Sequence, residues 1–255
     1  MSIRLEALSG GYEGFRLQNV SLEIRQRSLT ALIGPNGCGK STLLKTIAGQ
    51  IGPGDGRVSI GGDDIAMLRT KEVAKRVAVL PQHPIVPPGI TVEQLVAYGR
   101  APHQNLFGFR TAADDAKIAE AIETVALGEL ATRLVSDLSG GQRQRAFVAM
   151  VIAQDTPNVL FDEPTSFLDI RYQYEVLNLI QGLNRAGKTV VAVLHDIAQA
   201  ARYATDIVVM SGGDVRHRGA PSDTVTEEMI RDIYGLASRV FADPVSGTPM
   251  VTPLG

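Results

Sequence analysis

The stretch GPNGCGKS at residues 34–41 decides how this chain is expected to fold. It matches the pattern G-x-x-x-x-G-K-[ST] in full, and it lies between an apolar run at 29–33 and a helix expected at 41–48. Glycines allow successive backbone N–H groups to point at a polyphosphate, and the helix that follows adds the positive end of its dipole. The sequence therefore predicts a buried strand, a phosphate-binding loop and a helix, in that order.

Three side chains of this loop have different expected tasks. Lys40 is expected to bridge the β- and γ-phosphates of a nucleotide, and the Ser41 hydroxyl is expected to take one coordination position of Mg²⁺. Cys38 stands at a variable position of the pattern, and no general base is predicted beside it. We therefore expect Cys38 to be a structural thiol rather than a nucleophile.

The flanking sequence predicts an α/β core. After Pro157, short apolar strands alternate with helices, which is the spacing of βαβ units in a largely parallel, buried sheet. Alternating apolar and polar residues at 3–8 and 17–24, separated by a turn-rich break at 9–14, predict an N-terminal antiparallel β subdomain. Further strands are expected at 57–60, 77–80, 158–161, 189–194 and 206–210, and helices at 91–98, 112–126, 141–154, 171–186 and 196–203.

The middle of the chain carries helical patterns with almost no strand signal. This change predicts an α-helical subdomain inserted into the core of a P-loop NTPase fold. Because repeats, low-complexity tracts and long linkers are missing from the sequence, we expect one ATP-binding domain. The expected boundaries are 1–255 for that domain, roughly 85–155 for the helical subdomain, and 222–255 for a C-terminal part with a helix inside 226–234 and a hairpin around 243–247.

Composition narrows the classes of function. Lys and Arg number 25 and Asp and Glu 27, so the formal net charge of −2 gives no global attraction to nucleic acid. The single cysteine cannot form an internal disulfide. No stretch approaches the roughly 18 consecutive apolar residues of a membrane span, and the first residues lack the apolar core of a signal peptide. We therefore expect a cytoplasmic chain with no nucleic-acid partner, for which any membrane role must come through another protein.

A second chemical motif follows the apolar strand at 158–161. The strand ends in Asp162 and Glu163, and carboxyl ends of parallel strands meet the crevice in which ligands bind. Asp162 is expected to hold Mg²⁺, directly or through water. Glu163 is expected to polarise a water in line with the γ-phosphate. An acidic pair at a strand end is more often a solvated turn, but the phosphate loop favours the catalytic interpretation.

The segment LSGGQ at 138–142, followed by RQR at 143–145, is the third motif. Ser139 can cap the helix that begins after it, and Gly140 and Gly141 leave backbone N–H groups open to an anion. A simple helix cap would explain the serine and the glycines. It would not explain the whole string together with the two motifs above.

These motifs resemble the ATP-binding subunits of ABC transporters over essentially the whole chain. The family's motifs occur in order: the phosphate loop, Gln82 in LPQH, the signature at 138–142, the strand that ends in Asp162 and Glu163, SFLD at 166–169, and His195 in LHD. The resemblance implies ATP and Mg²⁺ as cofactors, Lys40, Gln82, Glu163 and His195 as catalytic residues, and Ser41, Gln82 and Asp162 at the metal. It implies nucleotide contacts for Tyr12, Gly34, Pro35, Asn36, Gly37, Cys38, Gly39, Lys40, Ser41, Thr42, Ser139, Gly140, Gly141 and Gln142.

The resemblance also assigns individual roles. Tyr12 matches the aromatic residue that stacks on adenine, although a ring at a glycine turn can also simply pack. Gln82 is similar to the residue that reaches Mg²⁺ and the attacking water, and His195 to the histidine that contacts the γ-phosphate. Asp169 resembles the residue that communicates across a dimer interface, whereas Phe167 departs from the small residue more common there.

In this family two copies face each other head to tail, so that the phosphate loop of one and the signature of the other enclose each ATP. The resemblance therefore implies an ATP-bound homodimer, and transmembrane permease subunits that contact roughly 83–105. An extracytoplasmic substrate-binding protein is implied as an indirect partner. The chain is expected at the cytoplasmic face of the inner membrane, as a peripheral subunit.

Within the family, the chain looks most like the ATPases of ferric-siderophore importers. The residues that carry this likeness lie at 95–103, 138–147 and 243–250. Haem, vitamin B12 and other solutes stay open as cargo, because the catalytic motifs are shared and this subunit does not touch the substrate. A non-transport ABC ATPase is disfavoured, because only 96 residues separate Thr42 from Leu138 and no heptad run is visible between them.

Overall fold

A computed structural model describes residues 1–12, 15–104 and 109–254 of this chain. A six-stranded sheet forms its centre, with strand order β10-β9-β3-β8-β7-β6. Every neighbouring pair is parallel except β9 and β10, which confirms the expected mostly parallel α/β core. The strands are β3 (Leu29–Ile33), β6 (Val77–Leu80), β7 (Asn158–Phe161), β8 (Thr189–Val193), β9 (Asp206–Ser211) and β10 (Asp214–Gly219).

Both faces of the central sheet are covered. Leu160 belongs to one apolar cluster with α1 (Lys40–Ile47) and the N-terminal strands, whereas its neighbours Val159 and Phe161 belong to a second cluster with most of the other helices. Side chains alternate across a strand, so a strand buried on both faces reads as one continuous apolar run. This is why the short apolar stretches of the sequence marked the central strands.

The second sheet has four strands in the order β2-β1-β4-β5, and all its pairs are antiparallel, as expected. The predicted break at 9–14 is too wide, because β1 continues through Gly10 and Gly11 to Tyr12, and residues 13–14 lie outside the described part. The pairing of β1 with β2 shifts register between Leu5 and Leu8 and again between Leu8 and Gly10, and positive φ angles occur at Ala7 (49°) and Gly10 (148°). The strands are β1 (Ile3–Tyr12), β2 (Phe15–Ile24), β4 (Asp55–Ile60) and β5 (Asp63–Asp64).

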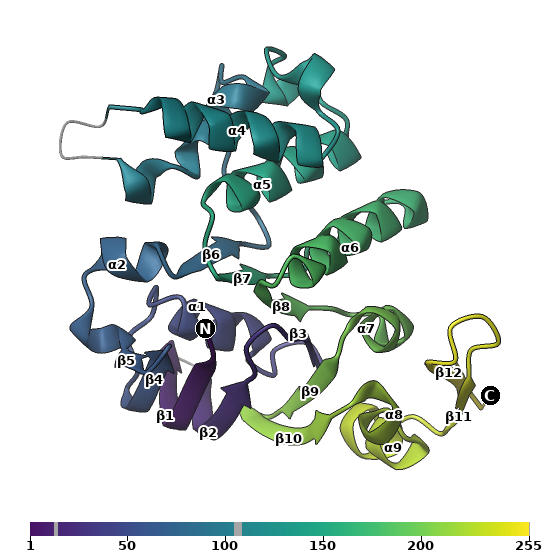
Figure 1. The fold of residues 1–255 in the computed structure, drawn as a ribbon. Helices are drawn as coiled ribbons and strands as arrows, with labels where there is room; N and C mark the ends of the chain where they lie inside the picture. The colour runs from purple at the N-terminus through teal and green to yellow at the C-terminus, as the bar shows by residue number, and fades with distance from the viewer. Residues whose placement is uncertain (13–14, 105–108, 255) are drawn as a thin grey trace.

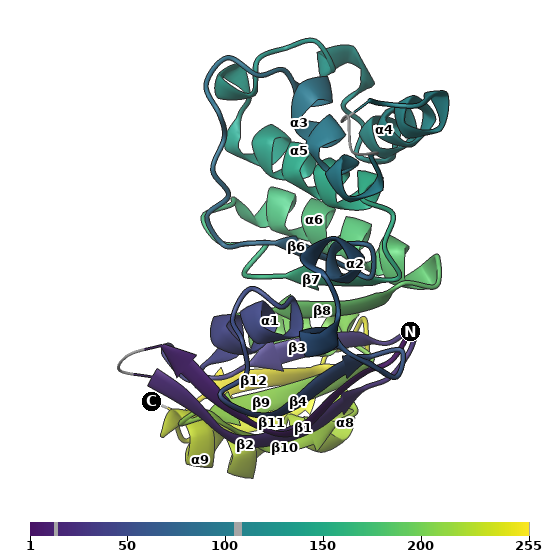
Figure 2. The same cartoon turned by 90° about the vertical axis from the view of Figure 1, so that its left-hand side faces the viewer.

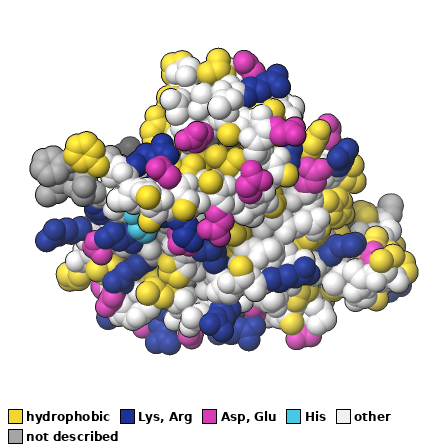
Figure 3. Space-filling view, turned by 45° about the horizontal axis from the view of Figure 1, so that its top comes forward, with side chains coloured by type: hydrophobic (Ala, Val, Ile, Leu, Met, Phe, Trp, Pro, Cys, Tyr) yellow, Lys and Arg dark blue, Asp and Glu magenta, His cyan; other side chains and the backbone are white. Residues whose placement is uncertain are grey.

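Three helices form a lobe beyond one edge of the central sheet: α3 (Val92–Tyr98), α4 (Ala112–Thr124) and α5 (Gly140–Ala153). Figures 1 and 2 both show them gathered above β6, with α6 (Ile170–Arg185) between them and the sheets. They lie where the sequence predicts an inserted helical subdomain. Figure 3 shows acidic, basic and apolar side chains intermixed on the face that includes this lobe.

The remaining elements lie outside the two larger sheets and the three-helix lobe. The strands β5 and β10 and helix α2 were not predicted, because β5 and α2 are very short and β10 is a polar edge strand without apolar alternation. No helix among the described residues combines the length and apolar character that a membrane crossing requires. The remaining α-helices and strands are α2 (Thr70–Ala74), α7 (Ile197–Tyr203), α8 (Pro221–Thr224), α9 (Glu227–Tyr234), β11 (Ser238–Ala242) and β12 (Pro249–Pro253).

Candidate active site

The phosphate loop connects β3 to α1, as the sequence predicts. Gly34 has a φ of 144°, and a Cβ at this position would lie 2.1 Å from the Met210 carbonyl oxygen, so the β9 backbone admits only glycine. Gly39 precedes α1 in the left-handed conformation, and no side chain caps the helix there. The amide groups of the first helical turn therefore face the loop without competition from a side-chain cap.

Lys40 lies over this loop and is 5% exposed. Its Nζ donates to the carbonyl oxygens of Gly34 at 2.7 Å and Pro35 at 2.9 Å. The Cys38 Sγ is buried 3.7 Å from the same ammonium group. Cys38 therefore packs beneath the loop, which agrees with the expectation of a structural thiol, while its backbone belongs to the phosphate-facing turn.

Asp162 and Ser41 meet at the edge of the sheet. The Ser41 hydroxyl donates to Asp162 Oδ1 at 2.8 Å, and Asp162 is 4% exposed. Burial raises the pKa of the Asp162 carboxyl, and the neighbouring charge of Glu163 raises it further, against the hydrogen bond from Ser41. A hydroxyl and a carboxylate are hard oxygen donors, so this pair fits a Mg²⁺ ion, whose positive charge would offset the cost of burying the carboxylate.

Glu163 is the centre of a second group of contacts. Its Oε2 accepts from Gln82 Nε2 at 2.6 Å and from the Ser166 hydroxyl at 3.0 Å, and its Oε1 lies 2.8 Å from His195 Nε2. Burial alone would raise the pKa of this carboxyl, but the hydrogen bonds from His195, Ser166 and Gln82 outweigh burial and lower it. Glu163 is therefore ionised at neutral pH.

Sheet topology explains why these residues meet. Gln82, Glu163 and His195 each follow a strand by two residues, and their strands β6, β7 and β8 are parallel neighbours. Parallel neighbours end at the same edge, so side chains far apart in sequence converge there. The φ of 51° at Glu163 turns its side chain away from the direction taken by Asp162. A cavity of about 230 Å³ joins Glu163 to the loop residues Asn36, Gly37, Gly39, Lys40, Ser41 and Thr42.

Gln82 and the pair formed by Ser41 and Asp162 were expected at one metal site, but they take part in two different hydrogen bonds. The Gln82 amide donates to Glu163, whereas the Ser41 hydroxyl donates to Asp162 in the pair of oxygen donors that fits Mg²⁺. Ser166 is a residue to which the sequence argument gave no task, although it lies within the SFLD string. The spacing of three residues between Glu163 and Ser166 is the feature of the sequence that could have indicated this contact.

Tyr12 lies at the end of β1, and its ring is 50% exposed. The Lys45 ammonium of α1 lies 5.7 Å from the centre of this ring. The tyrosine therefore presents an aromatic face beside the helix that follows the phosphate loop. This position is compatible with the expected stacking on adenine.

The signature segment begins α5. The Ser139 hydroxyl accepts from the Gln142 amide nitrogen at 3.3 Å, and Gln142 Oε1 accepts from the Ser139 amide at 3.0 Å, so the two residues form a capping box. Gly141 is buried against α6, because a Cβ there would lie 2.5 Å from the Tyr172 ring, whereas Ser139 and Gly140 are exposed. None of these residues is among the described residues that line the phosphate cavity.

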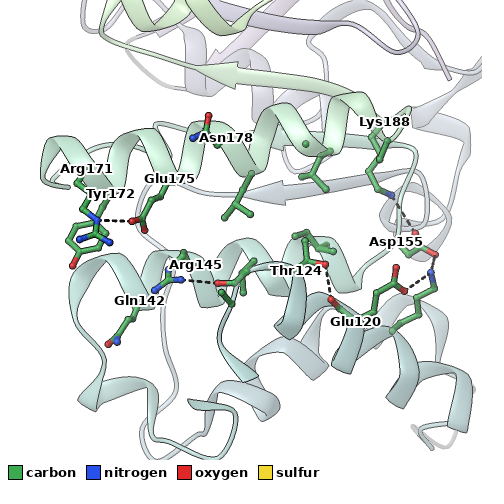
Figure 4. Close-up of a pocket in the computed structure, with 18 residues that line it drawn as sticks. Glu120, Thr124, Gln142, Arg145, Asp155, Arg171, Tyr172, Glu175, Asn178 and Lys188 are labelled. Atoms are coloured by element: carbon green, nitrogen blue, oxygen red, sulfur yellow. Dashed lines mark hydrogen bonds and ion pairs between the residues drawn. The ribbon is translucent and has the colours of Figure 1, made fainter. Parts of the chain in front are cut away.

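Gln142 instead lines a separate cleft between α6 and the helical lobe, with a volume of about 760 Å³ (Figure 4). The cleft is bordered by paired charges, because Asp155 contacts both Lys117 of α4 and Lys188 before β8, each at 3.4 Å. Arg145 of α5 donates to the Val125 carbonyl oxygen at the end of α4 at 3.0 Å. Arg145 thus fixes the signature helix to α4, and Asp155, just after that helix, links α4 to the core.

Phe167 and Asp169 follow Glu163 on the way to α6. Phe167 is 91% exposed with a φ of 63°, and its ring centre lies 6.2 Å from that of His83. Asp169 stands at the N-terminus of α6 without a side-chain capping bond. Both side chains are therefore available to a surface outside this chain.

A phosphate loop, a buried aspartate and a glutamate held by glutamine and histidine define a P-loop ATPase. A family model described as ABC transporter matches residues 17–166. The chain is 46% identical to the ferric enterobactin transport ATP-binding protein FepC of Escherichia coli (strain K12), over 99% of this chain and 94% of that protein. It is 38% identical to the iron(3+)-hydroxamate import ATP-binding protein FhuC of Bacillus subtilis (strain 168), over 98% of this chain and 93% of that protein.

Solved structures agree with the sequence comparison. An ABC transporter in an inward-facing conformation superposes with a TM-score of 0.87 at 28% identity, over 100% of this chain and 98% of that chain. The ATP-binding cassette MJ0796, solved as a dimer after hydrolysis with ADP and Pi, gives a TM-score of 0.75 at 29% identity, over 86% of this chain and 98% of that chain. This chain belongs to the ABC transporter family and is one of its nucleotide-binding ATPases.

Proposed function

We propose that this chain is the ATP-hydrolysing subunit that powers import of a ferric siderophore, bound to a permease at the cytoplasmic face of the inner membrane. FepC and FhuC, whose names give ferric enterobactin transport and iron(3+)-hydroxamate import, match nearly the whole chain and support this cargo. Cobalamin is the second candidate, because the cobalamin import ATP-binding protein BtuD of Halobacterium salinarum (strain ATCC 29341 / DSM 671 / R1) is 39% identical over 93% of this chain and 60% of that protein.

The observation that carries the catalytic role is the position of Glu163 on the wall of the phosphate cavity. Its carboxylate accepts a proton from, or orients, a water that attacks the γ-phosphate, while Gln82 and His195 hold the carboxylate in place. Lys40 exchanges its bonds to the Gly34 and Pro35 carbonyl oxygens for bonds to phosphate oxygens. The Lys40 ammonium then neutralises negative charge at the bond that breaks.

Ser41 and Asp162 are the residues that would hold Mg²⁺, with Gln82 able to approach from the neighbouring strand. The bound ion supplies positive charge that offsets the charge of the phosphates. The Ser41 hydroxyl and the Asp162 carboxylate contact each other directly, so the two donors lie side by side.

The signature segment of this chain serves the phosphate loop of a second copy. Ser139 and Gly140 are exposed at the N-terminus of α5, a 14-residue helix whose positive end favours an anion. Neither residue lines the cavity of its own phosphate loop. In an ATP-bound homodimer, each site combines the phosphate loop of one copy with the signature segment of the other. Loss of the γ-phosphate then lets the two copies separate.

The permease is proposed to contact the region 83–105. Ile85 is 90% exposed and Tyr98 is 51% exposed, and a cavity of about 430 Å³ lies beside Tyr98 with Ile90 and Ala97 in its wall. Exposed apolar side chains next to a hollow are typical of a protein-binding surface. An extracytoplasmic binding protein would deliver the cargo to the permease and would not touch this chain.

The test is uptake of labelled ferric siderophore by cells that lack this subunit. We expect uptake to be lost, and to return with the unmodified gene but not with a gene that encodes Glu163→Gln. Unchanged siderophore uptake together with lost cobalamin uptake would replace the proposed cargo by the second candidate. Reconstitution with the permease in liposomes then measures ATP hydrolysis directly.

A further inference from the structure

The turn that follows α3, residues 99–104, packs against the C-terminal end of the signature helix α5. At Gly99 the two backbones touch, because a Cβ there would lie 2.1 Å from the Met150 carbonyl oxygen and 3.1 Å from the Gln154 amide nitrogen. Only glycine fits this approach. The close approach of the two backbones therefore places residues 99–104 against the C-terminal end of α5, independently of their side chains.

Two side chains of the turn then bind the open carbonyl groups at the end of α5. Arg100 Nη1 donates to the Ala153 carbonyl oxygen at 2.8 Å, and His103 Nε2 lies 2.8 Å from the Gln154 carbonyl oxygen. The last carbonyl groups of a helix have no partner inside it. Here their partners come from a different segment, so the end of α5 is tied to the turn.

Arg100 is a buried cation, 8% exposed, and its charge is balanced by Asp114. Arg100 Nε donates to Asp114 Oδ1 at 2.8 Å, while Asp114 Oδ2 accepts from the backbone amide and the hydroxyl of Thr111. These hydrogen bonds lower the pKa of Asp114 to about 2, and the bond from the Thr111 backbone amide has the largest effect. Asp114 belongs to the first turn of α4. One arginine thus joins the end of α3, the start of α4 and the end of α5.

The same assembly is tied to the catalytic core. Gln154 Nε2 donates to the carbonyl oxygens of Ala74 at 2.7 Å and Val77 at 3.2 Å, and Lys71 Nζ donates to the Gln104 carbonyl oxygen at 2.5 Å. Val77 begins β6, the strand that leads to Gln82. The turn therefore contacts the signature helix and α2, and through Gln154 the start of the Gln82 strand.

Its location gives this assembly a task. Helix α5 has 14 residues, about 21 Å of axis at 1.5 Å per residue, with Ser139 at one end and the turn at the other. We propose that the turn 99–104, with Arg100 as its positioning residue, is a coupling clamp that passes movement of the signature segment to the permease-facing surface. This inference rests on the proposed function, because the region 83–105 is the proposed permease contact.

A purely structural explanation is that Arg100 only closes the helix ends. Buried ion pairs are replaceable by apolar side chains at little net cost, so stability alone does not require an arginine in this place. A coupling role predicts a loss that stability measurements do not show. The experiment must therefore separate communication with the permease from folding and from nucleotide-driven dimerisation.

The experiment uses the full chain, alone and in complex with its permease in liposomes. Arg100→Lys keeps the charge but is too short to hold Asp114 and the Ala153 carbonyl together, and His103→Ala removes the milder contact without leaving a buried charge. Glu120→Gln is the matched control, because it weakens an exposed ion pair of Glu120 with Lys117 on α4. Tyr98→Arg, on the exposed surface, tests permease contact itself.

We expect Arg100→Lys to reduce permease-dependent ATPase stimulation, and ferric siderophore imported per ATP, by roughly 5-fold to 150-fold, the range of ordinary coupling energies. His103→Ala should show a smaller loss, and Glu120→Gln none. ATP-driven dimerisation of the isolated chain and co-purification with the permease should persist in all three variants. Unchanged stimulation in both clamp variants would overturn the proposal, and so would a parallel loss of isolated-chain dimerisation.

Failure of the proposed function has different signs. If the unmodified complex hydrolyses ATP but moves no ferric siderophore, the cargo is wrong and the clamp is judged on ATPase stimulation alone. If Tyr98→Arg still co-purifies with the permease and retains stimulation, the proposed contact surface is wrong, and the clamp as stated falls with it. If Arg100→Lys does not fold, His103→Ala decides.

Discussion

The phosphate loop and the signature segment are both proposed to face nucleotide, yet this chain builds them in different ways. The loop shares a cavity with Glu163, and its residues Lys40 and Ser41 are engaged by groups of the same chain. The signature begins a helix in the other lobe, with Ser139 and Gly140 exposed. One chain thus brings the loop and Glu163 together, whereas in the proposed homodimer the enclosure of ATP is left to a second copy.

The largest expected effect comes from a substitution that removes the chemistry at the phosphate loop and leaves nucleotide binding intact. Glu163→Gln removes the carboxylate but leaves the loop and the Asp162 pair intact, so ATP binding should persist while turnover falls by roughly a hundredfold to ten-thousandfold. An ATP-bound dimer should accumulate, as gel filtration with ATP would show. Glu120→Gln makes the same substitution at an exposed site and should leave turnover unchanged. Near-normal turnover in Glu163→Gln would remove this residue from the mechanism.

A mixed dimer tests the division of the site between two copies. Lys40→Ala should lose nucleotide affinity, and Ser139→Arg should bind ATP as a monomer but fail to dimerise, because a long cation enters the enclosing surface. A dimer with one lesion in each copy keeps one intact site and one site with both lesions. We expect it to regain part of the ATP-dependent dimerisation that each homodimer lacks, whereas chains with both changes should not. Normal dimerisation by Ser139→Arg would contradict the composite site.

Adjacent glycines of the signature offer a smaller and more local test. Gly141→Ala places a methyl group against the Tyr172 ring and should lower the free energy of unfolding by about 1–3 kcal/mol. Gly140→Ala meets open space and should leave the isolated chain as stable or slightly more stable, because alanine is the better helix former. Urea unfolding of both variants measures the difference. Equal stabilities would mean that α6 does not position the signature.

The two lobes should also respond differently to acid. The pKa of Asp114 in the helical lobe is lowered to about 2, so its stabilisation is complete above the unfolded pKa near 4 and is lost as the pH falls towards 2. The contribution at neutral pH is about 2 kcal/mol. The pKa of Asp162 in the core is raised, so ionisation of this carboxyl lowers the free energy of unfolding as the pH rises, which is opposite to the effect of Asp114.

Asp114→Asn should therefore lower stability at pH 7 by at least about 2 kcal/mol, because Arg100 also loses its counter-charge, and it should flatten the loss between pH 4 and 2. Urea unfolding at pH 7 and pH 3 gives both values. An unchanged slope in the variant would show that Asp114 is not the group that titrates.

Local sequence determined much of this protein. Apolar runs at 29–33, 158–161 and 189–194 predicted buried parallel strands because a strand covered on both faces excludes polar side chains. The phosphate loop was readable because its glycines are needed wherever a backbone turns around phosphate, as the backbone at Gly34 illustrates. The order of the motifs by itself indicated the ABC transporter family.

Tertiary structure decided the rest, because strand order and packing are long-range properties that no short window of sequence contains. The convergence of Gln82, Glu163 and His195 follows from the adjacency of β6, β7 and β8. The bond from Ser166 to Glu163 depends on how the chain turns at a φ of 51°. The contact of Arg100 with the end of α5 joins residues 53 positions apart. Sequence determined which groups are present, and packing decided which of them touch.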